Sequence, residues 1–274
     1  MRNITKILGT GLVCLVAAQG FAKGVLPMED ANEGFVMTLN ANVATAYIDR
    51  GYTWNDGFVF QPSIEFLRGL GDIGDLEENS LGFNAWGNMN LSRYDRFYKS
   101  GEFSEIDLSA FWTFKVEGLD AIVQYTQQLF PLLSNGRSLG PVIHEFMLGL
   151  SKTFDNDITV GGEFYYDYST DARGVYVPLY VQYTLEMDRF SLTPRAHIGF
   201  ITKQISAGGH SGLNDYELRL TGKYALNDAT ALFARIGYVG SLDTDVLPRV
   251  KDMPFEKGGL DTKLYGLVGV SYDW

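Results

Sequence analysis

The chain has little cysteine, little histidine and no long apolar run beyond its first residues. One cysteine, Cys14, and 3 histidines in 274 residues exclude a disulfide framework and a cysteine-rich metal site. Lys and Arg (22) are outnumbered by Asp and Glu (33), for a net charge of −11. An acidic chain without basic patches is not expected to bind nucleic acid or anionic lipid surfaces. After residue 22 no segment approaches the ~20 apolar residues of a transmembrane helix.

The first residues have the layout of a secretory signal peptide. Arg2 and Lys6 precede an apolar run from Ile7 to Ala18, and the small residues Gly20 and Ala22 then stand at −3 and −1 of a cut after residue 22. A run of this length, followed by small residues, is typical of a cleaved export signal. The sequence therefore predicts a signal peptide at residues 1–22 and export of the remainder.

Cys14 offers an alternative, a lipoprotein signal, but Val13 stands where that signal needs a small residue. After removal of the leader no cysteine is left, so the exported chain must be held together by its core or by a membrane. We expect residues 23–34 to be a periplasmic N-terminal lead and residues 35–274 to form one domain.

Alternation of apolar and polar residues is the main signal in this domain. From Val175 to Leu185 every second residue is apolar or aromatic, and a second alternating segment starts at Phe190, after the short link Met187–Asp188. Two alternating segments joined by so short a link predict a β-hairpin. Read in this way, the sequence gives strands at 35–48, 58–67, 80–91, 102–116, 120–130, 142–154, 157–168, 175–186, 189–202, 214–226, 229–240 and 262–274.

The links between these segments alternate in length. Short turns are expected at 117–120, 155–157, 187–188 and 227–228, and long loops at 49–57, 92–101, 131–141, 169–174, 203–213 and 241–261. Short turns at one end and long loops at the other are typical of outer-membrane barrels, which have even strand numbers. The sequence thus predicts an all-β, antiparallel, twelve-stranded transmembrane barrel. Residues 68–79 depart from the rhythm, so they indicate either a large periplasmic loop or a slip in the strand count.

The end of the chain supports the same fold. Leu264, Val268, Tyr272 and Trp274 lie on one face of the last segment, which finishes on an aromatic residue. This resembles the C-terminal strand that the barrel-assembly machinery of Gram-negative bacteria reads. We therefore expect this machinery, through Trp274, and outer-membrane lipids and lipopolysaccharide to be partners, and the bacterial outer membrane to be the location.

A short segment near the N-terminus resembles a known first hairpin. Tyr47-Ile-Asp-Arg-Gly51, Asn55-Asp-Gly57 and Phe60-Gln-Pro-Ser63 are similar to a family of uncharacterised porin-like outer-membrane proteins (Gcw_chp-like). These proteins carry a Tyr-x-x-Arg-Gly turn, then Asp-Gly, then a Gln-Pro or Pro-x-x-Gln strand start. The resemblance covers about seventeen residues and implies a barrel but no activity. Taken alone, Arg50-Gly51 and Asn55-Asp56-Gly57 predict a plain loop.

The face of each strand that turns away from lipid is the best functional clue. The alternation predicts that charged residues line the lumen, namely Glu65, Asp107, Lys115, Glu145, Glu163, Asp167, Glu186, Arg195, His197, Glu217, Arg219, Lys223, Arg235 and Asp273. These charges either pair and close the lumen or line a narrow channel that selects ions. Bulky residues on the same face favour a constricted lumen or a stacking path for a small solute: Trp86, Phe111, Tyr165, Tyr176, Tyr180 and Tyr265.

An enzymatic alternative rests on Ser134-Asn-Gly-Arg-Ser138. The segment resembles the core around the nucleophile of outer-membrane phospholipase A, itself a twelve-strand barrel. In that family a His lies two residues before the nucleophilic Ser, and Leu132 stands here instead. Without a base in hydrogen-bond reach a Ser hydroxyl is a weak nucleophile, and His144 is the nearest histidine in the sequence. We therefore expect a turn rather than a catalytic site, and no enzymatic activity.

No metal or cofactor site is predicted. His144, His197 and His210 lack the spacing of metal ligands, and His197 is expected in a polar network beside Arg195. The loop with Asp243, Asp245, Asp252 and Glu256 is acidic enough to bind divalent cations that bridge lipopolysaccharide, but it also reads as a solvated loop.

The sequence thus favours a porin-like passive channel for small solutes or ions. A closed barrel with a structural or envelope-interaction role is the alternative, followed by the lipid hydrolase. A soluble β-sandwich competes at the level of the fold, but it gives no reason for the alternation of short and long links.

Overall fold

A computed structural model of the chain describes residues 35–92, 100–131, 142–169, 173–249, 259–261 and 263–274. The strands are β1 (Phe35–Ala44), β2 (Tyr47–Asp49), β3 (Tyr52–Asn55), β4 (Val59–Ile73), β5 (Leu76–Asn90), β6 (Phe103–Val116), β7 (Leu119–Leu129), β8 (Ile143–Thr153), β9 (Ile158–Asp167), β10 (Gly174–Tyr183), β11 (Leu185–Met187), β12 (Phe190–Ile201), β13 (Gly212–Ala225), β14 (Thr230–Ser241) and β15 (Leu264–Asp273). The described residues contain no helix with the length and hydropathy needed to cross a membrane.

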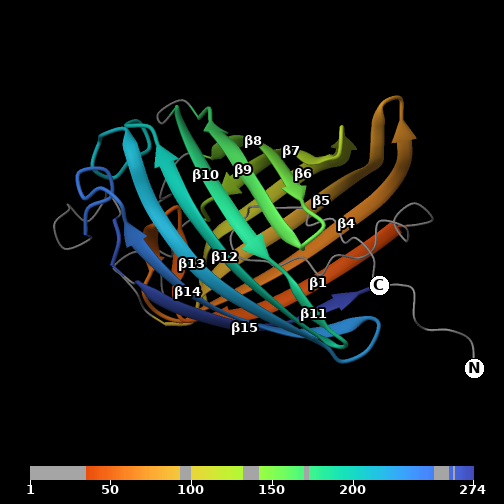
Figure 1. The fold of residues 1–274 in the computed structure, drawn as a ribbon. Coiled ribbons are helices and arrows are strands. Elements are labelled where there is room, and N and C mark those ends of the chain that lie inside the picture. The colour runs from red at the N-terminus through yellow and green to blue at the C-terminus, as the bar shows by residue number, and fades with distance from the viewer. Residues whose placement is uncertain (1–34, 93–99, 132–141, 170–172, 250–258, 262) are drawn as a thin grey trace, which may run out of the picture.

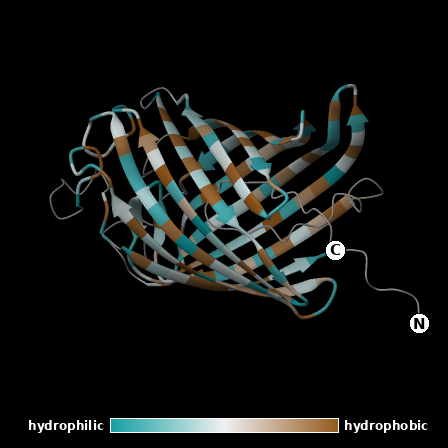
Figure 2. Ribbon diagram, in the orientation of Figure 1, coloured by the Kyte–Doolittle hydropathy of each residue, from teal (hydrophilic) through white to brown (hydrophobic). Residues whose placement is uncertain are grey.

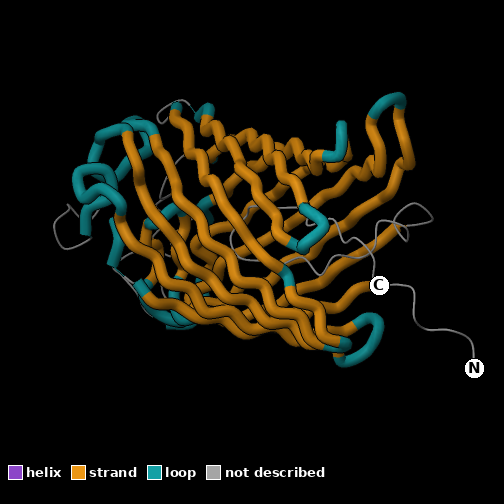
Figure 3. Tube along the Cα trace, in the orientation of Figure 1, coloured by secondary structure: helices purple, strands orange, loops and turns teal. Residues whose placement is uncertain are grey.

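Twelve long strands close into an antiparallel barrel (Figures 1 and 3). Each pairs with the strands before and after it along the wall, β10 pairs directly with β12, and the short β11 continues the line of β10. The seam closes where β1 pairs with β15, and the Trp274 backbone N–H donates to Met37 (2.8 Å). The predicted fold class, an all-β transmembrane barrel of twelve strands, is confirmed.

The outer surface of the wall is apolar. Hydrophobic and hydrophilic residues alternate along its strands (Figure 2). Leu218, Ile236, Leu264 and Val268 are each more than half exposed, although such side chains are normally buried in a soluble protein. Along β10 and β14 exposed residues alternate with buried ones. Alternation with the apolar face outward is the pattern of a barrel embedded in lipid.

The segment 68–79 is not a loop, and the strand count does not slip there. β4 and β5 stay paired to a two-residue turn at Gly74 and Asp75, and their hairpin extends beyond the neighbouring turns (Figure 1). The ladder shifts register around Gly71, whose φ is +70°, and the Asn79 amide donates to the Gly71 (2.9 Å) and Leu76 (2.8 Å) carbonyls. The left-handed backbone of Gly71 permits a bulge within a strand pair.

The first predicted strand was too long. The sequence indicated one strand at 35–48, but β1 ends at Ala44 and the chain then leaves the wall to form the separate β2–β3 pair. β1 and β4 remain neighbours, with Ala44 opposite Val59. The residues between these two positions are therefore an insertion at the long-loop end of the barrel, and they form the centre of the candidate site.

Candidate functional site in the barrel lumen

The inward hairpin, β2–β3 with its turn, lies inside the barrel. Asp49 pairs with Tyr52, so Arg50 and Gly51 form a two-residue turn. Both have left-handed backbone, with φ of +48° and +79°, as a type I′ turn requires. A Cβ on Gly51 would lie 2.5 Å from Leu247 Cδ2 and 2.9 Å from Asp215 Cβ. Glycine is therefore needed here both for its backbone conformation and for space.

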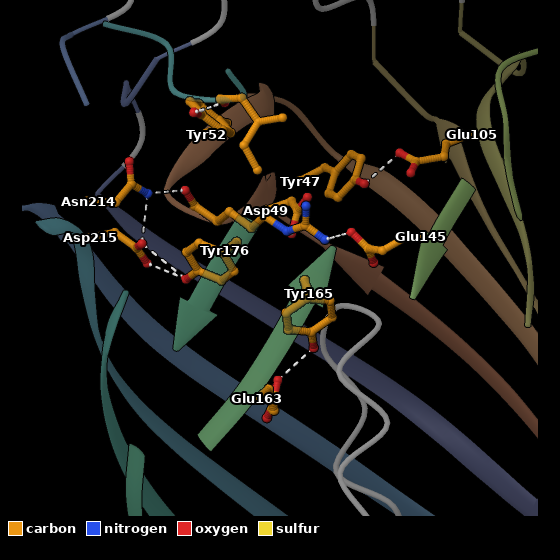
Figure 4. Close-up of polar contacts among 12 residues, drawn as sticks. Tyr47, Asp49, Tyr52, Glu105, Glu145, Glu163, Tyr165, Tyr176, Asn214 and Asp215 are labelled. Atoms are coloured by element: carbon orange, nitrogen blue, oxygen red, sulfur yellow. Dashed lines mark hydrogen bonds and ion pairs between the residues drawn. The ribbon is translucent and has the colours of Figure 1, made fainter. Parts of the chain in front are cut away.

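The tip of the hairpin reaches across the lumen to several strands (Figure 4). The Arg50 guanidinium forms an ion pair with Glu145 on β8. Its central carbon lies 4.9 Å from the ring centre of Tyr165 on β9 and 5.4 Å from that of Tyr176 on β10. On β13, two strands further along the wall from β10, the Asn214 amide donates to the Arg50 carbonyl at 2.7 Å. Contacts to four strands around the wall place the turn in the interior.

Electrostatics keep this guanidinium charged. Burial alone would lower the pKa of Arg50, but the carboxylates of Glu145 and then Asp49 raise it, so that it lies well above its ordinary value. The ring faces of Tyr165 and Tyr176 add cation–π attraction. Arg50 is therefore a fixed positive charge in the lumen.

Further contacts fix the base of the inward hairpin. The Tyr47 hydroxyl donates to Glu105 on β6 at 2.6 Å. The Tyr52 hydroxyl donates to the Ile205 carbonyl (2.7 Å) and accepts from the Ala207 amide (2.9 Å), both in the loop after β12. The hairpin is therefore held by hydrogen bonds to separate parts of the chain. It is not the plain loop that its turn residues indicated.

An apolar cluster, here called the plug cluster, packs around the hairpin at the long-loop end. Its most buried members include Ile201, Val246, Leu247 and Leu260, at 0–4% exposure, and Tyr52 of the hairpin packs with them. In a water-filled pore of uniform width these side chains would be exposed to solvent. The lumen is therefore constricted at this end by the hairpin and the loops that cover it.

Below the tip the lumen carries a second polar group. Arg195 on β12 lies 3.9 Å above the Tyr180 ring and 3.2 Å from Glu163 on β9. Arg219 lies 3.7 Å from Glu217, whose carboxylate also accepts from the Tyr265 hydroxyl. Arg219 and Glu217 lie on the same strand, β13, but Arg195 and Glu163 join β12 to β9 and Glu217 and Tyr265 join β13 to β15, so the charged side chains meet inside the barrel.

His197 belongs to this network. Its Nε2 lies 2.9 Å from Asp215 and its Nδ1 lies 3.3 Å from Glu217. The other two histidines lie elsewhere: His144 pairs with the Tyr125 hydroxyl (2.8 Å), and His210 is exposed. Within the described residues no group of three or more His, Cys, Asp or Glu is arranged to hold a metal ion. Of the acidic loop, Asp252 and Glu256 lie outside these residues.

The residues predicted to line the lumen differ in burial. Asp107, Glu145, Glu163, Asp167, Glu217 and Arg235 are buried, whereas Glu65, Lys115, Arg195, His197, Arg219, Lys223 and Asp273 are half-buried and Glu186 is exposed at the short-turn end. Among the bulky residues, Trp86, Phe111, Tyr165, Tyr176 and Tyr180 are buried and Tyr265 is half-buried. The structure brings Glu145, Tyr165 and Tyr176 together around Arg50, and Glu163, Arg195, His197, Glu217, Arg219 and Tyr265 into the second group.

Sequence reasoning missed several polar residues of the interior, among them Arg50, Tyr47, Glu105 and Asp215. Glu105 and Asp215 had a usable signal, since each lies two positions before a residue already placed on the inward face. Tyr47 and Arg50 had none, because they leave the strand pattern. The Ser134–Ser138 segment and Leu132 lie outside the described residues.

Solved barrel structures are similar to this chain. An outer membrane channel from Pseudomonas putida F1 matches with a TM-score of 0.54 at 10% identity, over 88% of this chain and 96% of that chain. The chain has the fold of an outer-membrane β-barrel. The NanC porin (TM-score 0.47, 11% identity, 86% of this chain and 98% of that one) and the KdgM porin in complex with disordered oligogalacturonate (0.45, 7%, 86% and 98%) are also similar. No protein-family model matches this barrel chain, and no curated protein matches its sequence. The resemblance of the first hairpin to a porin-like family stays a prediction.

Proposed function

We propose that the protein is a porin-like channel of the bacterial outer membrane that passes small solutes or ions through a constricted lumen. The observation that carries the proposal is a closed wall with an apolar outer face and ion pairs inside, such as Arg195 with Glu163. Charged side chains buried in hydrocarbon or in a dry core are costly. Ion pairing offsets this cost for Arg195 and Glu163, and charged side chains along a narrow lumen select ions.

The inward hairpin is the proposed constriction. It is inserted between Ala44 and Val59, which lie opposite each other on β1 and β4, so the wall does not need it to close. Its tip places the positive charge of Arg50 between Glu145 and the rings of Tyr165 and Tyr176. An element that the wall does not need but that crosses the lumen is suited to limit what passes.

The test is single-channel conductance in planar bilayers, with wild type compared to a variant in which an Asn-Gly turn replaces residues 45–58. The register of Ala44 with Val59 allows a two-residue turn to join the strands directly. A constricted channel predicts small stepwise conductance in wild type and a several-fold larger step in the shortened variant. Equal conductance in both would show that the constriction lies elsewhere.

A closed barrel with a structural or envelope-interaction role is the second candidate. The plug cluster favours it, because Ile201, Val246 and Leu247 are almost fully buried at the long-loop end. This role predicts a folded, heat-modifiable barrel that stays electrically silent even after the hairpin is removed. Silence in wild type with conduction in the shortened variant would instead identify the hairpin as a complete plug.

Assembly and location follow from the same proposal. The apolar outer face is suited to the lipids of the outer membrane, including lipopolysaccharide. The last strand presents Trp274, 73% exposed, beside the β1–β15 seam. This position supports recognition of Trp274 by the barrel-assembly machinery after export by the predicted signal peptide.

A further inference from the structure

Three arginines lie side by side on the inner face of neighbouring strands. Arg195 on β12 is the direct register partner of Arg219 on β13, and Arg235 on β14 is opposite Thr221, two residues from Arg219. We call Arg195, Arg219 and Arg235 the arginine cluster. Like charges in directly opposed positions of a sheet repel each other. Negative charge must offset this repulsion.

The carboxylates in the described residues do so only in part. Arg195 pairs with Glu163 at 3.2 Å. Arg219 lies 3.7 Å from Glu217, but that carboxylate also accepts from the Tyr265 hydroxyl and lies 3.3 Å from His197. Two carboxylates therefore face three guanidinium groups, and one of the two is shared.

Arg235 is the member without a carboxylate. It is 4% exposed, its Nε donates to Thr221 Oγ1 at 3.1 Å, and it forms no ion pair with any residue that the structure describes. The Nε of Arg195 is likewise buried and has no hydrogen-bond partner among these residues. A buried guanidinium donor without an acceptor is costly, and so is a buried guanidinium without a carboxylate, so the arrangement is suited to a ligand that brings negative charge.

We propose that the arginine cluster binds a small anion, a halide or the carboxylate group of a solute. The planar guanidinium fork matches a carboxylate and also forms charge-assisted bonds with single ions. The ring centre of Tyr180 lies 3.9 Å from the guanidinium carbon of Arg195, and this contact holds the Arg195 guanidinium in place. Because these side chains are largely buried, the site takes an ion or one carboxylate group rather than a bulky ligand.

The anion reaches this site from the short-turn end. Toward that end the inner face of β13 continues with the hydroxyl of Thr221 and the ammonium group of Lys223, whose charge the carboxylates of Asp273 and Glu186 partly offset. Toward the long-loop end lie the carboxylates of Glu105, Glu145 and Asp215, together with the inward hairpin. This inference rests on the proposed function in one respect, since it needs a lumen that ions can enter.

The test uses bromide as the probe, because its anomalous scattering locates it in crystals of the detergent-folded protein. Wild-type crystals soaked in sodium bromide should show a peak within hydrogen-bond distance of the cluster, away from lattice contacts. Arg235→Gln should lose this peak, or need about tenfold more bromide for equal occupancy, as expected when one charge-assisted bond is lost. Arg68→Gln changes an exposed arginine outside the cluster and should keep it.

The readout separates this inference from the channel proposal. A wild-type protein that conducts in bilayers but shows no bromide at the cluster would overturn the anion site and leave the channel standing. A silent barrel with bromide at the cluster would keep the site and overturn the channel. If Arg235→Gln does not fold, Arg235→Lys keeps the charge but removes the fork, and it should bind bromide more weakly than wild type. Equal binding would count against the fork geometry.

Discussion

The guanidinium of Arg50 forms an ion pair with the carboxylate of Glu145, 95 residues further along the chain. The two groups come from different parts of the fold, the tip of the inward hairpin and the wall strand β8. Both side chains are largely buried, with 16% and 5% of their surface exposed. This pair fixes how far the hairpin reaches across the lumen, and therefore the width of the proposed constriction.

Removing either partner should destabilise the barrel, because the remaining charge stays buried without compensation. We expect Arg50→Gln and Glu145→Gln each to lower the free energy of unfolding by up to about 3–5 kcal/mol, and the double variant by less than the sum of the two. Urea unfolding of the protein folded into lipid vesicles measures all three. A double variant whose loss equals the sum would show that the groups do not interact.

The left-handed turn at Gly51 should tolerate no side chain. In Gly51→Ala the new Cβ would meet Leu247 and Asp215 at 2.5 Å and 2.9 Å, and the backbone φ of +79° is strained for alanine. We expect a loss of ~1–3 kcal/mol and a larger conductance as the tip moves. Gly118→Ala is the matched control, since Gly118 also has positive φ (+71°) but an added Cβ has nothing within 4 Å. If Gly51→Ala lowers the free energy of unfolding by no more than Gly118→Ala does, backbone strain alone explains the loss, and the contacts with Leu247 and Asp215 do not contribute.

Trp274 should matter more for assembly than for stability. Its side chain is 73% exposed, while its backbone exchanges hydrogen bonds with Met37 at 2.8 and 3.0 Å. Because alanine keeps these backbone bonds, Trp274→Ala should unfold at nearly the same urea concentration as wild type but accumulate less in the outer membrane of cells. Tyr272→Ala, on the same strand and 41% exposed, serves as the comparison. Equal accumulation of both variants would contradict a special role of the terminal Trp.

We expect the ionisation of Asp56, in the link between β3 and β4, to make stability depend on pH. Partial burial and then the nearby Asp261 carboxylate raise the pKa of Asp56 above its ordinary value. A raised pKa in the folded state means that ionisation of Asp56 destabilises the fold as the pH rises through that pKa. Asp56→Asn should therefore gain stability relative to wild type as the pH rises from below about 3.9 toward neutral, and unfolding midpoints across this range measure the gain. A difference that is independent of pH would contradict it.

Much of the fold could be predicted because each strand carries its own signal. The alternation from Val175 onward correctly predicted that β10 pairs with β12. In this pair Tyr180 lies directly opposite His197, and both are on the inner face. The segment 68–79 was an exception. It indicated a large periplasmic loop or a slip in the strand count, yet Gly71 and Gly74 permit the bulge and the turn of the extended β4–β5 hairpin.

The candidate site was only partly predictable. Alternation marked Glu145, Glu163 and Arg235 for the inner face, but it could not pair them, because their partners are set by barrel closure. Glu163 meets Arg195 from β9 to β12, two strands apart on the wall. The distances between side chains on different strands depend on the register and shear of the closed barrel. The sequence of a single segment does not determine these quantities.

The sequence by itself determined the twelve-strand barrel, its apolar outer face and the residue types of its inner face, because a period of two is written into each strand. Only the tertiary structure decided what fills the interior. Residues 47–55 form an inward hairpin because Glu145 and Asn214, 95 and 164 residues away from Arg50, hold its tip. The tertiary structure also places no carboxylate of the described residues in an ion pair with Arg235. Such contacts exist only once the barrel has closed, since closure brings together groups that are remote along the chain.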